Sequence, residues 1–290
     1  MRLAVSTYSM WRWMEERGRT LEQALEWIKA AGVDGVEFVG VGAKQGEDAI
    51  AVAKRMRARC ADLGLVVAGY CAGAEFLVAD AEQRKAVEAV KREVDIAAAL
   101  GATNMRHDVT RGPEDAQATS IDEVVRRVAP AVREVTEHGA KLGVRTSVEN
   151  HGFYLQTAER VERLVAGVGH PNFGVTLDLG NFMCLDQDPV ASAERLAPRA
   201  IMVHAKDFHV RPKADMPLPG WFATPTAIAL RGAIVGHGAI DLKRSLAALQ
   251  KAGYRGFLSL EFEGIEDPES GIKMGLDWLR ARIGATAAAK

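Results

Sequence analysis

Residues 121–151 read IDEVVRRVAPAVREVTEHGAKLGVRTSVENH and contain the pattern that decides the fold. A helical segment over 121–142 ends before Gly143, and a short, mainly apolar run over 144–149 follows it and ends in Glu149. Glycine is favoured just past a helix C-terminus because it adopts the left-handed conformation without a steric penalty. Mainly apolar runs are typical of parallel strands that are covered on both faces. This stretch therefore predicts one helix–strand unit of a parallel α/β protein.

The same unit recurs along the whole chain, with Gly32, Gly64, Gly101 and Gly253 in the position of Gly143. The predicted strands are 2–7, 34–39, 65–70, 103–108, 144–149, 173–178, 200–206 and 257–262. The first helix follows a capping-box spacing at Thr20 and Gln23, and the others are predicted at 46–63, 82–100, 121–142, 157–167, 190–197, 241–252 and 270–283.

Eight strand–helix units in strict alternation predict a parallel sheet with right-handed crossovers, and eight is the number that closes a barrel. We therefore expect a single (β/α)8 TIM barrel over residues 1–285, with residues 286–290 as a frayed tail. An open doubly wound sheet is the alternative, but its glycine-rich turn after the first strand is replaced here by SMWRWMEERG. Residues 208–240 have no helical period and predict a long insertion after the seventh strand, of a kind that commonly helps to build active sites.

Composition narrows the classes of function. The chain has 290 residues, 48% of them hydrophobic and 26% charged, as in a globular protein with a large core. A net charge of −1 offers no basic surface for nucleic acid or anionic lipid. The three cysteines, Cys60, Cys71 and Cys184, lack CxxC spacing and are expected to be reduced thiols. We found neither a signal-peptide pattern nor an apolar run of roughly 18–20 residues, so a cytoplasmic location without membrane or nucleic-acid partners is expected.

Ionisable residues gather at the predicted carboxyl ends of the strands, where barrels of this kind place their active sites. Four of them end consecutive strands at equivalent heights: Glu149, Asp178, His204 and Glu261. Taken singly, each has a structural alternative, such as a helix cap or a hydrogen-bonded histidine. Together, three carboxylates and one imidazole predict a site for one divalent metal ion, with Mn²⁺, Mg²⁺ or Co²⁺ favoured over Zn²⁺.

Further residues are candidates for binding substrate. His107, His151 and Glu37 end or follow predicted strands, and Trp13 follows the first strand at the expected barrel mouth. In the insertion, Arg211 and His237 could reach the same pocket. Each has a structural alternative in hydrogen bonding or core packing. Lys206 and Asp207 are expected to pair with each other.

The segments SVENHG, TLDLGN, MVHAKDF and YRGFLSLEFEG resemble the xylose-isomerase-like superfamily of sugar isomerases and epimerases. The resemblance covers almost the whole predicted barrel and is weakest over 208–240. It implies that Glu149, Asp178, His204 and Glu261 hold the metal, and that Glu149 and Glu261 are the catalytic proton-transfer pair. It also implies a small carbohydrate or polyol substrate and a possible homo-oligomer.

The expected chemistry is removal of a proton next to a carbonyl through a metal-stabilised enediolate, with two carboxylates exchanging the proton on opposite sides of the substrate. A metal-dependent lyase or dehydratase on a keto-sugar, keto-inositol or oxidised glycoside would use the same site and is the alternative. Asn181 stands where ketose epimerases of the superfamily have a histidine, and no phosphate-binding loop is evident.

Two further classes of function are more remote. An apurinic-site endonuclease of the same superfamily needs a three-zinc cluster, with additional ligands on strands 2, 3 and 4. A non-enzymatic binding barrel would not need the four-ligand set.

Overall fold

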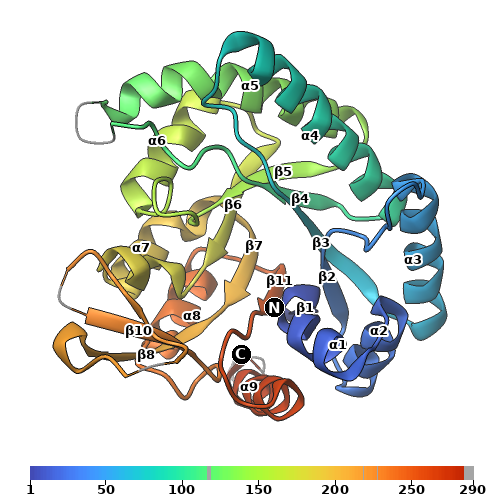
Figure 1. Ribbon diagram of the computed structural model, residues 1–290, viewed down its shortest axis with the longest axis vertical. Coiled ribbons are helices and arrows are strands. Elements are labelled where there is room, and N and C mark those ends of the chain that lie inside the picture. Colours follow the sequence, from blue (N-terminus) through green and yellow to red (C-terminus); the bar gives the residue numbers. More distant parts are fainter. Residues whose placement is uncertain (116–118, 218, 227, 284–290) are drawn as a thin grey trace.

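The computed structural model describes residues 1–115, 119–217, 219–226 and 228–283, so the expected tail at 286–290 lies outside the described residues. Its centre is a closed barrel of parallel strands (Figure 1). In order around the barrel, the strands are β1 (Arg2–Ser6), β11 (Phe257–Leu260), β7 (Ala200–Ala205), β6 (Phe173–Asp178), β5 (Arg145–Glu149), β4 (Asn104–His107), β3 (Val66–Ala72) and β2 (Gly35–Val39). Strand β1 pairs with both β11 and β2, and this pairing closes the barrel.

A ring of helices surrounds the barrel (Figure 1). It consists of α2 (Leu21–Ala30), α3 (Ala49–Leu63), α4 (Asp80–Leu100), α5 (Ile121–Lys141), α6 (Ala158–Val168), α7 (Pro189–Leu196), α8 (Leu242–Lys251) and α9 (Pro268–Ile283). The predicted single (β/α)8 barrel is therefore confirmed. Thr20 and Gln23 form the predicted capping box of α2, and Gly143 has a φ of 73° between α5 and β5.

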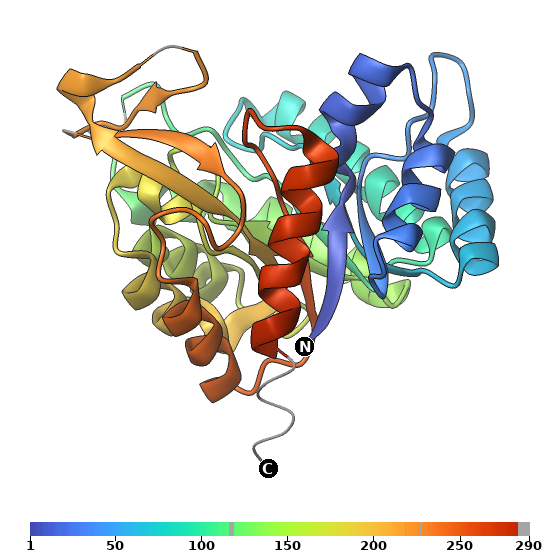
Figure 2. The same ribbon diagram turned by 90° about the horizontal axis from the view of Figure 1, so that it is seen from below.

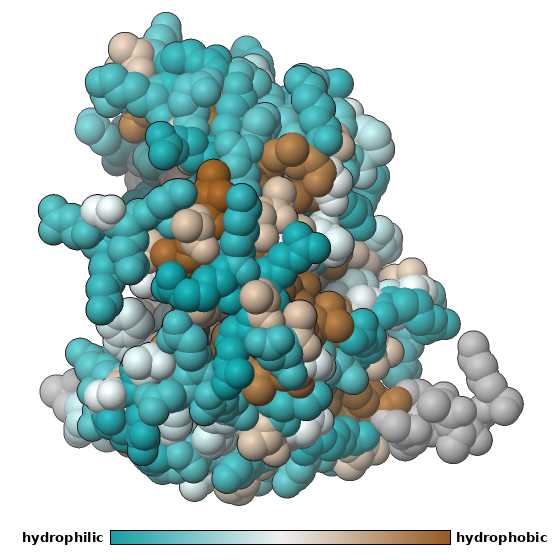
Figure 3. Space-filling model, turned by 90° about the vertical axis from the view of Figure 1, so that its right-hand side faces the viewer, coloured by the Kyte–Doolittle hydropathy of each residue, from teal (hydrophilic) through white to brown (hydrophobic). Residues whose placement is uncertain are grey.

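The core lies between the barrel and the inner faces of the helices. Leu25 on α2, Val128 on α5 and Leu164 on α6 are fully buried there. Figure 3 shows the molecule from the right-hand side of Figure 1. This outer face of the helix ring is mainly hydrophilic, and its apolar residues form separate patches. Among the described residues, none of the helices combines the length and the apolar character that crossing a membrane would require.

One helix was not predicted from the sequence. Helix α1 (Trp11–Arg17) follows a 3-10 turn at Thr7–Met10, in the place where a doubly wound fold would have a glycine-rich turn. It begins directly above the carboxyl end of β1, so its first residues lie at the barrel mouth (Figure 2).

The predicted insertion after β7 is a small antiparallel sheet and not an irregular loop. Strands β8 (Asp207–Pro212), β10 (Ile228–Ala233) and β9 (Phe222–Ala223) pair in that order. The sheet projects from the end of the barrel that holds the carboxyl ends of the strands, which is the end toward which the β1 arrow points (Figure 2). The insertion therefore adds a wall beside the end of the barrel where functional residues gather.

Candidate metal centre

The four expected metal ligands converge at the carboxyl end of the barrel. Glu149 and Asp178 end β5 and β6, His204 lies on β7, and Glu261 directly follows β11. These strands are consecutive around the barrel, and all four side chains are buried. From His204 Nδ1, the nearest carboxylate oxygens of Glu149, Glu261 and Asp178 are 3.4, 3.5 and 3.7 Å away.

One potential ligand atom from each residue lies within 4.8 Å of the other three, which is the spacing of atoms around a common ion. His204 Nδ1 is buried and has no hydrogen-bond partner among the described residues, and buried Asp178 Oδ2 has none besides its 3.2 Å ion pair with Lys206 Nζ. A buried polar atom without a hydrogen bond is costly, and a bound cation would provide a partner for both atoms. The donor set of three carboxylates and one imidazole therefore fits a divalent metal ion.

The local charge balance supports the same interpretation. Besides the three ligand carboxylates, Glu37 contacts His204 and Glu263 pairs with Lys206, whereas the fixed cations in contact with the cluster among the described residues are Arg106 and Lys206. Five carboxylates against two cations leave an excess of negative charge at a site where, of the five carboxylates, only Glu263 is exposed. A divalent cation would offset most of that excess.

His204 is oriented by a residue from the opposite side of the barrel. Its Nε2 lies 2.9 Å from Glu37 Oε1 on β2, so Nε2 carries the proton and Nδ1 faces the three carboxylates. Burial would lower the pKa of His204, but Glu37, Glu261 and Glu149 outweigh it and raise that pKa well above its ordinary value. A metal ion would take the place of the second proton.

Cys71 on β3 contacts the Glu37 carboxylate that pairs with His204. Its Sγ lies 3.5 Å from Glu37 Oε1, and Glu37, Cys71 and His204 form a second group with the spacing of metal ligands. Burial, aided by Glu37, raises the pKa of Cys71 to about 12, so the thiol stays protonated and serves as a hydrogen-bond donor. Among the described residues, these two groups share His204 and do not provide the separate ligands that a three-zinc nuclease needs.

Asp178 is fixed through its backbone and one carboxylate oxygen. The Asn150 side chain accepts from Asp178 N and donates to Asp178 O, both at 2.9 Å. Asp178 Oδ1 accepts from the backbone of Gly180 and Asn181 at 2.7 and 2.8 Å, which leaves Oδ2 directed at the cluster. Asn181, which stands in place of a histidine, donates its amide to Glu149 at 3.1 Å and accepts from Lys206 at 3.2 Å.

Two cations that were not predicted as site residues hold the carboxylates. Arg106 Nε donates to Glu149 Oε2 at 2.6 Å. Lys206 Nζ lies 2.9 Å from Glu261, 3.0 Å from Glu263 and 3.2 Å from Asp178.

The expected Lys206–Asp207 pair is therefore wrong, because neighbouring residues of an extended chain point to opposite sides. Asp207 points outward and accepts from backbone N–H groups at 208, 236, 238 and 240.

The environments of Glu149 and Glu261 push their pKa values apart. Burial favours the neutral form of both, but Arg106 and His204 hold the pKa of Glu149 well below its usual range. For Glu261, burial outweighs Lys206 and His204 and raises the pKa. Pairs of carboxyl groups whose pKa values are separated in this way are typical of acid–base catalysis.

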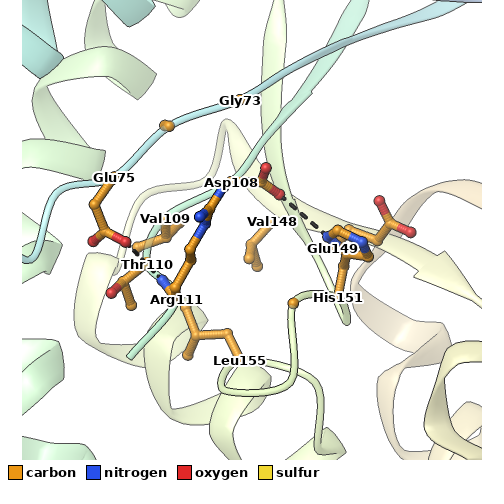
Figure 4. Close-up of a pocket in the computed structure, with 12 residues that line it drawn as sticks. Gly73, Glu75, Asp108, Val109, Thr110, Arg111, Val148, Glu149, His151 and Leu155 are labelled. Atoms are coloured by element: carbon orange, nitrogen blue, oxygen red, sulfur yellow. Dashed lines mark hydrogen bonds and ion pairs between the residues drawn. The ribbon is translucent and has the colours of Figure 1, made fainter. Parts of the chain in front are cut away.

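The cluster opens into a chamber of about 160 Å³ that is lined by Tyr8, Arg106, His151, Lys206 and Glu263 as well as by ligands. A second cavity of about 390 Å³ adjoins it at Glu149 and His151 and is also lined by Asp108 and Arg111 (Figure 4). In that view His151 Nδ1 faces Asp108 Oδ1 at 3.6 Å. His151, which was predicted to bind substrate, therefore lies where a substrate bound at the metal cluster would extend.

The other predicted substrate residues lie elsewhere. Side chains of His107 and Trp13 are buried: His107 Nδ1 contacts Asp108 O, and Trp13 Nε1 donates to Glu269 at 2.7 Å. Their burial does not support the expected contact with substrate. Arg211 and His237 line a separate hollow of the insertion, and no described residue lines both this hollow and the chamber over the cluster.

Comparison with known proteins tests the resemblance inferred from the sequence. The model of the family described as "Xylose isomerase-like TIM barrel" matches residues 25–282. The chain belongs to this family. The resemblance inferred from the strand-end motifs is thereby confirmed.

The proteins that resemble this chain have different named activities. A 3-dehydroshikimate dehydratase of Pseudomonas putida is 28% identical over 248 residues, which are 83% of this chain but 36% of that protein, so the chain spans about a third of its length. A solved structure of an IolI protein with a bound zinc atom has a TM-score of 0.76 at 17% identity, over 98% of this chain and 99% of the other. The 3-keto-D-glucoside 4-epimerase YcjR of E. coli has a TM-score of 0.71 at 15% identity, over 97% and 99%. The two structures establish likeness of fold.

Proposed function

We propose that the protein is a divalent-metal-dependent isomerase or epimerase that moves a proton next to the carbonyl of a keto-sugar or polyol. The observation that carries the proposal is the convergence of Glu149 and Glu261 on His204 Nδ1 from either side, at 3.4 and 3.5 Å. Two carboxylates at one buried point can remove a proton from a substrate carbon and return one. The epimerase among the similar structures supports the same class of reaction.

Each side chain then has a definite role. Glu149, held ionised by Arg106, accepts the proton, and Glu261, held by Lys206, returns one. Glu149, Asp178, His204 and Glu261 would hold the metal, which supplies stabilisation of the negative charge that develops on a substrate oxygen. His151 and Asp108 line the cavity beyond Glu149 and would contact substrate hydroxyl groups. Manganese is our first choice of metal, with magnesium, cobalt or zinc as alternatives, and the zinc-bound structure of similar fold favours testing zinc as well.

A lyase reaction is the second candidate, and the dehydratase relative is the observation that favours it. Elimination of water begins with the same proton abstraction. Lys206 places an ammonium group 2.9 Å from Glu261, in a position to assist departure of a hydroxyl group. Product mass distinguishes the two reactions, because isomerisation conserves it and elimination does not.

Deuterium exchange tests the proposal. The Mn²⁺-loaded protein would be incubated in D₂O with ketoses, inososes and keto-glycosides, and products would be analysed by NMR and mass spectrometry. We expect exchange at one carbon-bound hydrogen of an isomerised product, and a loss of about 10²-fold or more in Glu149→Gln and in Glu261→Gln. Leu142→Ala, at an exposed apolar position after α5, is the control and should retain full activity. Loss of water or an aglycone would establish the lyase, and absence of exchange with every substrate would refute both.

A further inference from the structure

A third cavity adjoins the chamber over the metal cluster. It measures about 390 Å³, lies between α1, the loop after β11 and the insertion, and shares Tyr8 and Glu263 with the chamber. The two spaces therefore adjoin each other at these two residues. A substrate bound at the cluster through its keto-polyol part could extend a substituent into this cavity.

The lining of this cavity is mostly apolar. Trp11 on α1, Phe222 on β9, and Phe262 and Ile265 after β11 contribute to it. Trp11 is 64% exposed and Ile265 is 50% exposed, although both are large apolar side chains. Apolar side chains that gather at one place on the surface usually mark a binding site, whereas scattered ones do not.

The charged residues of the cavity are already engaged. Arg12 donates to the carbonyl oxygens of Gly264 and Glu266, each at 2.6 Å, and Glu263 is paired with Lys206 at 3.0 Å. Both charges are therefore at least partly offset by groups of the protein itself. The chemistry of the cavity therefore favours an uncharged, apolar occupant.

The insertion provides a pre-organised wall. A Cβ at Gly232 on β10 would lie 2.5 Å from the backbone of Glu263, so the insertion packs directly against the loop after β11. Arg231 pairs with Glu266 of that loop at 3.0 Å, and Phe208 packs edge-on against Phe222 with ring centroids 6.0 Å apart. A site that is already formed loses little free energy to ordering when a ligand binds.

We propose that this cavity is a subsite for an aromatic or other apolar substituent of the substrate, so that the preferred substrates are keto-glycosides with an apolar aglycone. The proposal rests on the proposed function, because the subsite acts on a substrate held at the metal cluster. It also gives the insertion a role, which is to close the aglycone site with Phe222 and the backbone at Gly232.

The test compares methyl and phenyl 3-keto-β-D-glucopyranosides as substrates of the Mn²⁺-loaded protein, with kcat/KM as the readout. We expect the wild type to prefer the phenyl compound about tenfold, the order expected for stacking and burial of one aromatic ring. Trp11→Ala and Ile265→Ala should each reduce the phenyl-over-methyl ratio, Trp11→Ala by about fivefold. Leaving-group differences cancel in the comparison between variants, and Leu142→Ala, at an exposed apolar position after α5, should leave the ratio unchanged.

The outcomes separate this proposal from the proposed function. Turnover of the methyl compound with no preference for phenyl, or an unchanged ratio in Trp11→Ala, would overturn the subsite and leave the isomerase intact. If neither compound reacts or binds, the subsite is refuted, whereas the isomerase is refuted only if the ketoses and inososes also show no exchange. If Trp11→Ala changes the molecular mass in solution but not the ratio, the apolar residues form an interface between copies and the subsite is refuted.

Discussion

His204 shows how a single contact sets the properties of the metal centre. Its Nε2 is paired with Glu37 on the far side of the barrel, so Nδ1 is the atom presented to the carboxylates. The sequence located both residues at strand ends but predicted Glu37 as a substrate contact, because its partner lies 167 positions away in the chain. Likewise, Arg106 and Lys206 were visible as strand-end residues, but their pairing depends on strand order and on which way each side chain points.

We predict that Glu37→Gln weakens metal binding about tenfold, because the neutral amide orients His204 and increases its basicity less well than the carboxylate does. Titration of Mn²⁺ against a competing chelator measures the effect. Glu47→Gln changes an exposed glutamate shortly after β2 and should bind metal as the wild type does. Equal affinity in the two variants would show that Glu37 does not tune the site.

Among the elements, the insertion was the hardest to predict from the sequence. Its boundaries after the seventh strand were expected, but its three strands were not, because strands of two to six residues are too short to show a clear pattern. The barrel elements were predicted well because each helix has its own apolar stripe and cap, and these are local properties. Helix α1 was missed since its seven residues have no such stripe, and contacts with the loop before α9 and with α9 itself hold it in place.

Asp207 is the anchor of the insertion, and we predict that Asp207→Ala loosens it. The carboxylate accepts four backbone N–H groups, and its removal leaves them without their acceptor, at a cost of about 2–4 kcal/mol in stability. Hydrogen exchange followed by mass spectrometry should show faster exchange at residues 236–240 than in the wild type. Asp215→Ala, in the exposed turn after β8, is the matched control. Unchanged exchange at 236–240 would contradict this role.

For the molecule as a whole, the candidate functional residues lie at the carboxyl ends of the barrel strands, whereas the residues that stabilise the fold lie mainly in the rest of the core. The carboxyl ends concentrate buried charge, while the remainder of the core is apolar apart from hydroxyl side chains such as Thr146, Ser147 and Thr176. His107 is an exception that belongs to the core: it is fully buried between Phe76 and Phe173. Its burial lowers its pKa, and the hydrogen bond to Asp108 O and the Asp108 charge only partly oppose that effect.

This burial predicts a dependence of global stability on pH. The unfolded chain protonates His107 near pH 6.5, whereas the folded chain resists protonation. The contribution of neutral His107 to the free energy of unfolding is therefore fully present above pH 6.5 and is lost as pH falls below it. Between pH 7.5 and 5.5 the wild type should lose up to about 1.4 kcal/mol more free energy of unfolding than His107→Gln. Urea unfolding at both pH values measures the difference. Parallel losses in the two proteins would show that His107 titrates normally.

The central claim is that Glu149, Asp178, His204 and Glu261 bind one divalent metal ion, and metal content tests it most directly. The protein would be purified without chelator, offered Mn²⁺, Mg²⁺, Co²⁺ and Zn²⁺ in turn, and analysed by mass spectrometry of the elements. We predict about one ion per chain in the wild type and in Glu47→Gln, and loss of most of it in Glu149→Gln and His204→Ala. A folded wild type that binds none of the four metals, or variants that retain full occupancy, would contradict the account.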